Sequence, residues 1–129
     1  MTQELKTAVP ISLEQAQQWV TNYVTVQSGD FIRAFLVSAD DLTSILAEKN
    51  KNDESPNFVR FYLASDTPHG TTEDLHLVLT AAYSADGTPG NAIDFVQKDD
   101  PNAQDYPLYD FTHPCPSTCD TNSALYITG

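Results

Sequence analysis

Two stretches of similar sequence decide which fold this chain can adopt. Residues 31–37 read Phe-Ile-Arg-Ala-Phe-Leu-Val, and residues 58–63 read Phe-Val-Arg-Phe-Tyr-Leu. Each stretch is apolar on both faces apart from one arginine, which is typical of a strand that is covered on both sides. A segment with helical character separates them, so together they predict a strand–helix–strand unit. Such a unit usually closes as a right-handed crossover between parallel strands.

The two stretches place the only arginines of the chain, Arg33 and Arg60, at the same position. If the strands pair in that register, both guanidinium groups lie side by side on one face of the sheet. One interpretation is an anion-binding pocket at Arg33 and Arg60, because guanidinium groups bind carboxylate and phosphate bidentately. The other is internal pairing with an aspartate: Asp74, Asp94 or Asp110. The excess of acidic residues favours internal pairing, since an arginine in an apolar strand needs a partner.

Capping signals mark the starts of two helices. Ser12, with Gln15 three residues later, predicts a helix that runs to about Val26. Ser38, with Asp41 three residues later, starts the second helix in the same way. Apolar residues at helical spacing form the predicted buried face of the first helix: Leu13, Ala16, Val20, Tyr23 and Val24. The corresponding face of the second helix consists of Leu42, Ile45 and Leu46.

The remaining strands complete a small sheet. We expect a third strand over residues 74–83, antiparallel to the second, then a short edge strand over 93–96 and an extended piece over 109–111. This order predicts an α+β fold with a small mixed sheet, packed by one or two helices and followed by an irregular C-terminal segment. The length predicts one domain over residues 1–129, with residues 106–129 as a tail packed on it.

Composition and charge exclude several classes of function. The chain has 129 residues, of which 40% are hydrophobic and 19% charged, as expected for a soluble globular protein. Eighteen Asp and Glu against six Lys and Arg leave a net charge of −12, which argues against nucleic-acid and anionic lipid partners. No apolar run approaches the ~20 residues of a membrane helix, and no signal peptide precedes the first helix. We therefore expect a cytoplasmic protein.

The least generic stretch is residues 106–120, Tyr-Pro-Leu-Tyr-Asp-Phe-Thr-His-Pro-Cys-Pro-Ser-Thr-Cys-Asp. Its residues His113, Cys115 and Cys119 offer an imidazole and two thiolates, so zinc is one candidate cofactor. A structural zinc site needs a fourth ligand, however, and the spacing is not the common C-x2-C. The two cysteines are spaced C-x3-C, which also differs from the C-x-x-C motif of thioredoxin-like redox proteins. The preferred interpretation is therefore structural, without a cofactor: two thiols, by default free in a reducing cytoplasm, pack as small apolar groups. A local disulfide between Cys115 and Cys119 is the open alternative.

Three segments carry a resemblance to a known family. They are residues 35–42, residues 59–63 and residues 110–120, the last with the pattern Asp-Phe-Thr-x-Pro-Cys-Pro-x-x-Cys-Asp. With them the chain resembles, over about two-thirds of its length, a family of small uncharacterised bacterial proteins found mainly in the Bacteroidetes. The resemblance implies a shared fold and a bacterial origin, and it implies no particular chemistry.

No common catalytic signature occurs in the chain. The patterns G-x-S-x-G, G-x-x-x-x-G-K and H-E-x-x-H are absent. Asp74 and His76 fall on one face of the third strand, where an acid–histidine pair is more often a surface feature than a general base. We therefore expect a non-enzymatic interaction module that uses the edge of its short apolar sheet to bind a protein partner or a second copy. The alternatives are metal binding by the cysteine-containing tail and an anion pocket, in an enzyme or a binder, at the two arginines.

Overall fold

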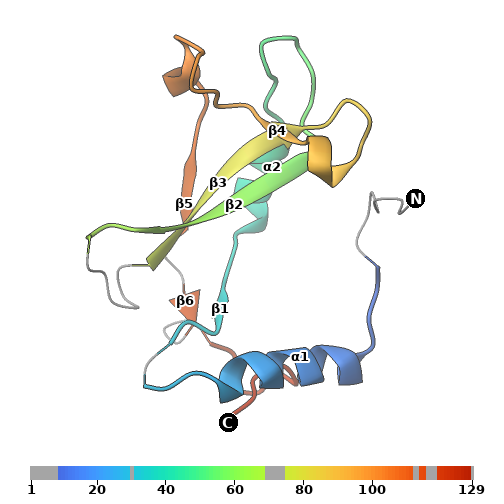
Figure 1. The fold of residues 1–129 in the computed structure, drawn as a ribbon, viewed down its shortest axis with the longest axis vertical. Helices are drawn as coiled ribbons and strands as arrows, with labels where there is room; N and C mark the ends of the chain where they lie inside the picture. Colours follow the sequence, from blue (N-terminus) through green and yellow to red (C-terminus); the bar gives the residue numbers. More distant parts are fainter. Residues whose placement is uncertain (1–8, 30, 69–74, 112–113, 116–118, 129) are drawn as a thin grey trace.

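The computed structural model describes residues 9–29, 31–68, 75–111, 114–115 and 119–128 (Figure 1). The helices within these ranges are α1 (Leu13–Thr25) and α2 (Ala39–Leu46). The strands are β1 (Ala34–Phe35), β2 (Phe58–Ser65), β3 (Leu75–Tyr83), β4 (Ile93–Asp94), β5 (Tyr109–Phe111) and β6 (Pro114–Cys115). Two short 3-10 helices, Pro89–Asn91 and Ala103–Asp105, lie in the loops on either side of β4.

β3 is the central strand of a four-stranded sheet in which every pairing is antiparallel. β2 pairs with β3 along one side, from Phe58 opposite Ala82 to Ser65 opposite Leu75. β4 and β5 share the other side of β3, with β4 near its end and β5 near its start. The predicted α+β class is therefore confirmed, and the sheet is antiparallel rather than mixed.

The parallel pairing predicted for the first two strands is wrong. Only Ala34 and Phe35 of the first stretch form a strand, and β1 pairs antiparallel with β6 in a separate two-stranded sheet. Phe35 and Val37 pack against the buried core instead of extending the sheet. An apolar pattern reports that a segment is buried, and it does not report which neighbour covers it. Here the segment is only partly buried, because Phe35 and Val37 pack on the core while Leu36 is exposed.

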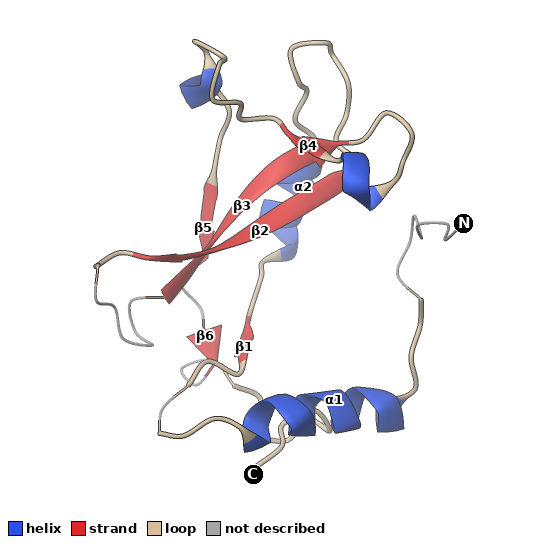
Figure 2. Cartoon of the chain, viewed as in Figure 1, coloured by secondary structure: helices blue, strands red, loops and turns tan. Residues whose placement is uncertain are grey.

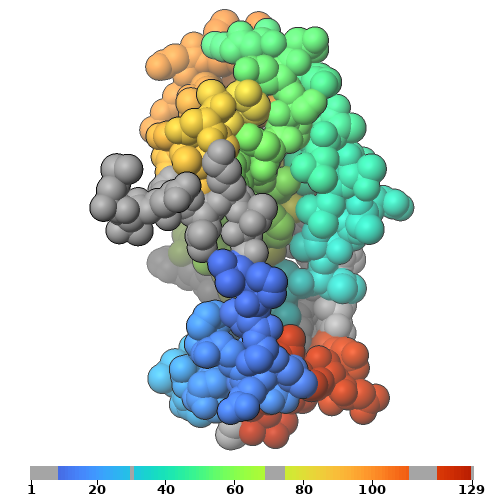
Figure 3. Space-filling model, turned by 90° about the vertical axis from the view of Figure 1, so that its right-hand side faces the viewer, coloured from blue at the N-terminus to red at the C-terminus, as the bar shows by residue number. Residues whose placement is uncertain are grey.

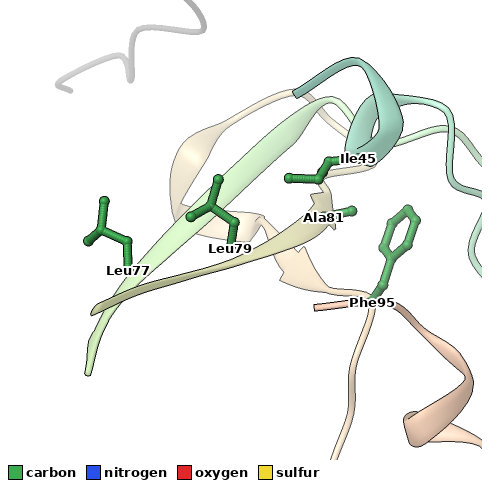
Figure 4. Close-up of a cluster of buried hydrophobic side chains, with 5 residues drawn as sticks. All are labelled: Ile45, Leu77, Leu79, Ala81 and Phe95. Carbon is green, nitrogen blue, oxygen red and sulfur yellow. The ribbon is translucent and has the colours of Figure 1, made fainter. Parts of the chain in front are cut away.

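The main core lies between α2 and β3 (Figure 4). Successive inward residues of β3, Leu77, Leu79 and Ala81, point to one face because side chains alternate along a strand. Ile45 of α2 and Phe95 after β4 complete the cluster, and Ile45 is fully buried. Leu42 is partly buried as predicted, but Leu46 is half-exposed because it lies on the side of this two-turn helix turned away from β3.

The capping signals are confirmed. The Ser12 side chain accepts a hydrogen bond from the Gln15 amide (3.0 Å) and starts α1. The Ser38 side chain accepts from the Asp40 amide (3.2 Å) and starts α2. Because a cap depends only on residues within one turn, sequence alone was sufficient to place both starts.

α1 lies beside the C-terminal residues at one end of the molecule, away from the four-stranded sheet (Figures 2 and 3). Only Val24 of its predicted buried face is fully enclosed, whereas Leu13 and Tyr23 are about half exposed. Trp19 and Val26, on the same side of the helix as Tyr23, are also exposed. Thus only part of the apolar side of α1 has a partner among the described residues.

Candidate functional site

A cavity of about 350 Å³ lies between α1, β1 and the C-terminal tail. Its apolar wall comes from three parts of the chain: Val20 and Val24 of α1, Phe35 and Leu36, and Leu125 and Tyr126 of the tail. Arg33, Cys119, Asp120 and Ser123 add polar or polarisable groups. The structure thus brings together Arg33 and Cys119, two residues that the sequence singled out for unrelated reasons.

Arg33 is fixed at this cavity by three contacts. Its Nη1 donates a hydrogen bond to the carbonyl of Ile127. Its guanidinium carbon lies 4.7 Å from the ring centroid of Phe31 and 4.8 Å from that of Tyr126. Cation–π contacts of this kind are stabilising, and more so where the cation is partly shielded from water. Arg33 forms no ion pair with any carboxylate in the part of the chain that the structure describes.

Two further hydrogen bonds hold the walls of the cavity in place. Gln17 Nε2 of α1 donates to the carbonyl of Ala124 (3.1 Å), which connects the helix to the tail. The Tyr23 hydroxyl donates to the carbonyl of Ile32 (2.7 Å), which connects the helix to the residues before β1. The Tyr23 and Phe31 rings also meet edge to face with centroids 6.1 Å apart. Hydrogen bonds between segments that are distant in sequence therefore hold the three walls of the cavity together.

The predicted zinc ligands are only partly visible. Cys119 is disulfide-bonded, so the expectation of a free thiol there is wrong. The reason is that a cysteine count does not reveal whether the backbone brings two sulfurs within bonding distance. The side chains of His113 and Cys115 lie outside the described residues. Because a disulfide sulfur is not a thiolate, zinc binding by this tail would require reduction first, and it stays a prediction.

Arg60 has partners of its own. Its Nη1 forms an ion pair with Asp94 Oδ1 (2.8 Å), and its Nη2 donates to the carbonyl of Ala92 (3.2 Å). The Tyr62 hydroxyl donates to the other carboxylate oxygen of Asp94. The Arg60 side chain is 39% exposed and that of Asp94 only 10%, so the ion pair is partly shielded from solvent. Arg60 is thus paired internally with Asp94, one of the three aspartates that the sequence offers as partners.

The side-by-side placement predicted for Arg33 and Arg60 is wrong, because β1 and β2 do not pair. The matching positions of the two arginines had suggested one shared clamp. Instead, Arg33 belongs to the cavity beside α1, and Arg60 belongs to the junction of β2 with β4. Anion binding by either arginine alone stays a prediction.

His76 of β3 lies between two carboxylates. Its Nδ1 is 2.8 Å from Asp110 Oδ1, and its Nε2 is 3.1 Å from Asp66 Oδ2. Hydrogen bonding to Asp110, and next to Asp66, raises the pKa of His76. Asp74, the partner suggested by strand alternation, lies outside the described residues. Asp110 was missed because it reaches His76 through the pairing of β5 with β3, which the sequence did not reveal.

Glu48, just after α2, is a titratable residue that the sequence did not indicate. Both carboxylate oxygens are shielded from solvent, and no described donor lies in good hydrogen-bond geometry with them. Burial raises the pKa of Glu48, and interaction with the Tyr109 hydroxyl lowers it by a smaller amount. Burial and the neighbouring Glu48 charge raise the pKa of Tyr109. Neither residue lines the cavity beside α1.

The outer edge of the four-stranded sheet is the second notable surface. β2 is an edge strand: among the described residues it pairs only with β3. Three consecutive side chains in it are strongly exposed for their size: Phe61 at 45%, Tyr62 at 46% and Leu63 at 80%. Exposed apolar edge strands are uncommon in proteins that act alone, because they present unpaired backbone groups to other chains.

Comparison with known proteins gives no match to a family model, a curated protein or a solved structure. No helix in the described ranges has the length and apolar character needed to cross a membrane. Nor do the side chains in those ranges include a group of three or more His, Cys, Asp or Glu placed to hold a metal ion. The candidate function therefore rests on the cavity and on the sheet edge.

Proposed function

We propose that this protein is a non-enzymatic interaction module that binds an extended segment of another protein along the edge of β2. The observation that carries the proposal is the run Phe61–Tyr62–Leu63 in an eight-residue strand whose outer edge pairs with no other described strand. An added strand gains backbone hydrogen bonds from the edge and side-chain contacts from the exposed apolar groups. No proline interrupts β2, so its outward backbone groups are available to such a partner.

Charge indicates the chemistry of that partner. Glu54 precedes β2, Asp66 follows it, and the single cation within it, Arg60, is already paired with Asp94. The whole chain carries a net charge of −12, which opposes the approach of a second copy. We therefore infer a partner segment that alternates apolar residues with lysine or arginine. Electrostatic complementarity of this kind raises the association rate and selects against acidic partners.

A peptide of alternating valine and lysine tests this proposal. Fluorescence anisotropy of the labelled peptide measures its affinity for wild-type protein, for Leu63→Lys and for Val26→Lys. Leu63 and Val26 are both highly exposed, so the two variants add the same charge and remove a similar apolar group at different places. We expect Leu63→Lys to weaken binding by about tenfold or more, and Val26→Lys to weaken it about twofold.

A second peptide separates strand addition from general attraction between charges. It has the same side chains but carries N-methyl groups on alternate amides, which removes backbone donors. Binding that survives N-methylation, or that falls equally in both lysine variants, overturns the proposal. Sedimentation velocity examines the remaining alternative, since a dimer that Leu63→Lys dissociates would make a second copy the occupant of the edge.

The cytoplasmic location and the bacterial family resemblance stay predictions. The disulfide at Cys119 bears on the first of them, because structural disulfides persist mainly in oxidising compartments. Alkylation of thiols in intact expressing cells, followed by mass spectrometry, measures the state of Cys119 directly. An alkylated Cys119 supports the cytoplasm, and a protected one points to an oxidising compartment.

A further inference from the structure

The cavity beside α1 contains a positive charge, Arg33, that forms no ion pair with a carboxylate among the described residues. The chain has eighteen acidic residues and two arginines, and one arginine, Arg60, has its carboxylate in Asp94. Arg33 has a carbonyl and two aromatic rings instead. Asp120 lines the same cavity, but its Oδ1 accepts a hydrogen bond from the Asn122 amide (3.0 Å) and it forms no ion pair with Arg33.

The contacts that Arg33 makes with described residues leave most of its N–H donors without an acceptor. A guanidinium group has five N–H donors in one plane, and the Ile127 carbonyl accepts from one of its nitrogens. Aromatic rings contact a guanidinium through its face, so they do not use the N–H groups at its edge. The three contacts also hold the Arg33 side chain in one place. Binding of an anion therefore loses little side-chain conformational entropy.

The rest of the cavity is suited to an apolar group. Seven apolar side chains line it: Val20, Val24, Ala34, Phe35, Leu36, Leu125 and Tyr126. A volume of about 350 Å³ is at the small end of the range for ligand pockets. An apolar chain in this space removes hydrophobic surface from water while its head group reaches the guanidinium.

We propose that this cavity binds a small amphipathic monocarboxylate, with the carboxylate on Arg33 and the apolar chain among the side chains of α1 and the tail. Two carboxylate oxygens match two N–H donors of a guanidinium edge. A single negative charge fits better than a phosphate dianion, because the molecule is strongly acidic and Asp120 stands at the same cavity. The proposal is independent of strand addition at β2, since it uses different residues.

Octanoate is the probe. Isothermal titration calorimetry measures its binding to wild-type protein, alongside acetate, which has the head group alone, and 1-octanol, which has the chain alone. We expect octanoate to bind at least about tenfold more tightly than either fragment. We also expect Arg33→Gln to weaken octanoate binding about tenfold or more, because a charge-assisted bidentate contact is lost.

Arg60→Gln is the matched control. It removes the other arginine, which is ion-paired with Asp94 and lies outside this cavity, so octanoate affinity should change less than about twofold. Equal losses in both variants would show that octanoate responds to overall charge, and they would overturn the proposal.

Nuclear magnetic resonance on wild-type protein keeps the test decisive if Arg33→Gln fails to fold. Octanoate should shift the amide signals of Val20, Val24 and Leu125, which line three parts of the wall. It should also change the fluorescence of Trp19, the only tryptophan, which precedes Val20 in α1. Shifts confined to other regions, or no shifts at millimolar octanoate, would exclude this binding site.

Discussion

Ile45 is the fully buried side chain of α2 and packs in the core beside β3. It is fully buried among Leu77, Leu79 and Phe95. Replacing it with alanine removes several buried methyl groups and leaves a cavity, so we expect Ile45→Ala to lower the free energy of unfolding by about 2–5 kcal/mol. Urea denaturation measures this change.

Its neighbour provides the comparison. Leu46 is half-exposed, so Leu46→Ala should cost less than about 1 kcal/mol. If the two variants are equally destabilised, α2 does not pack on β3 through the face that carries Ile45.

His76 predicts how stability depends on pH. The neighbouring carboxylates of Asp110 and Asp66 raise its pKa in the folded protein. A histidine with a raised folded pKa contributes stability that is fully present below its unfolded pKa of about 6.5 and disappears as the pH rises through the folded value. We therefore expect this contribution to fall between about pH 6.5 and the folded pKa, and to be absent in His76→Gln.

The two carboxylates are not equivalent. Asp110 has the largest effect on the pKa of His76, so Asp110→Asn should lower that pKa more than Asp66→Asn does. A histidine ring titration by nuclear magnetic resonance gives both values. The opposite order would mean that Asp66 is the dominant partner in solution.

At the same scale, sequence reasoning identified the arginines but not their roles. Arg33 and Arg60 occupy equivalent positions in similar stretches, yet one contacts aromatic rings and the other an aspartate. Residue type indicates what a side chain can bind. Its partner depends on which distant segment the fold brings alongside, and for Arg33 that segment is 94 residues away.

Among the elements, local signals predicted well and long-range ones did not. Ser12 and Ser38 marked the starts of both helices, because a cap involves neighbouring residues only. The third strand was placed correctly over the described residues of β3 from its alternation. The pairing of β1 with β6 was missed, because a two-residue strand has no pattern that specifies a partner. The cavity depends on that pairing, and so it was missed as well.

The cysteine-containing segment gives a prediction at the scale of one element. Cys119 is disulfide-bonded, and Cys115, four residues earlier, is the only other cysteine in the sequence. A disulfide restricts the unfolded chain, so reduction should lower the free energy of unfolding by about 2 kcal/mol. Urea denaturation with and without a phosphine reductant measures the loss.

A variant with serine at both cysteine positions is the control for that experiment. It should resemble the reduced protein and show no response to the reductant. If wild-type protein is equally insensitive to reduction, the disulfide makes no contribution to stability.

For the whole molecule, charge is the dominant property. A net charge of −12 on 129 residues destabilises the folded state, because its acidic side chains repel one another. The screening length falls from about 30 Å at 0.01 M salt to about 10 Å at 0.1 M, so added salt should weaken this repulsion. We expect the melting temperature to rise over this range in sodium chloride. A fall would mean that attractive pairs such as Arg60–Asp94 outweigh the general repulsion.

The contact between α1 and the tail has a consequence for how the protein is made. Gln17 and Ala124, which are hydrogen-bonded in the finished molecule, are separated by 107 residues. A ribosome that adds about 5–20 residues per second needs roughly 5–20 s to cover that distance. During this interval the nascent α1 has no tail to cover Val24, and Trp19 and Val26 are exposed in any case. α1 therefore leaves the ribosome well before the tail that covers it, and it is enclosed only late in synthesis.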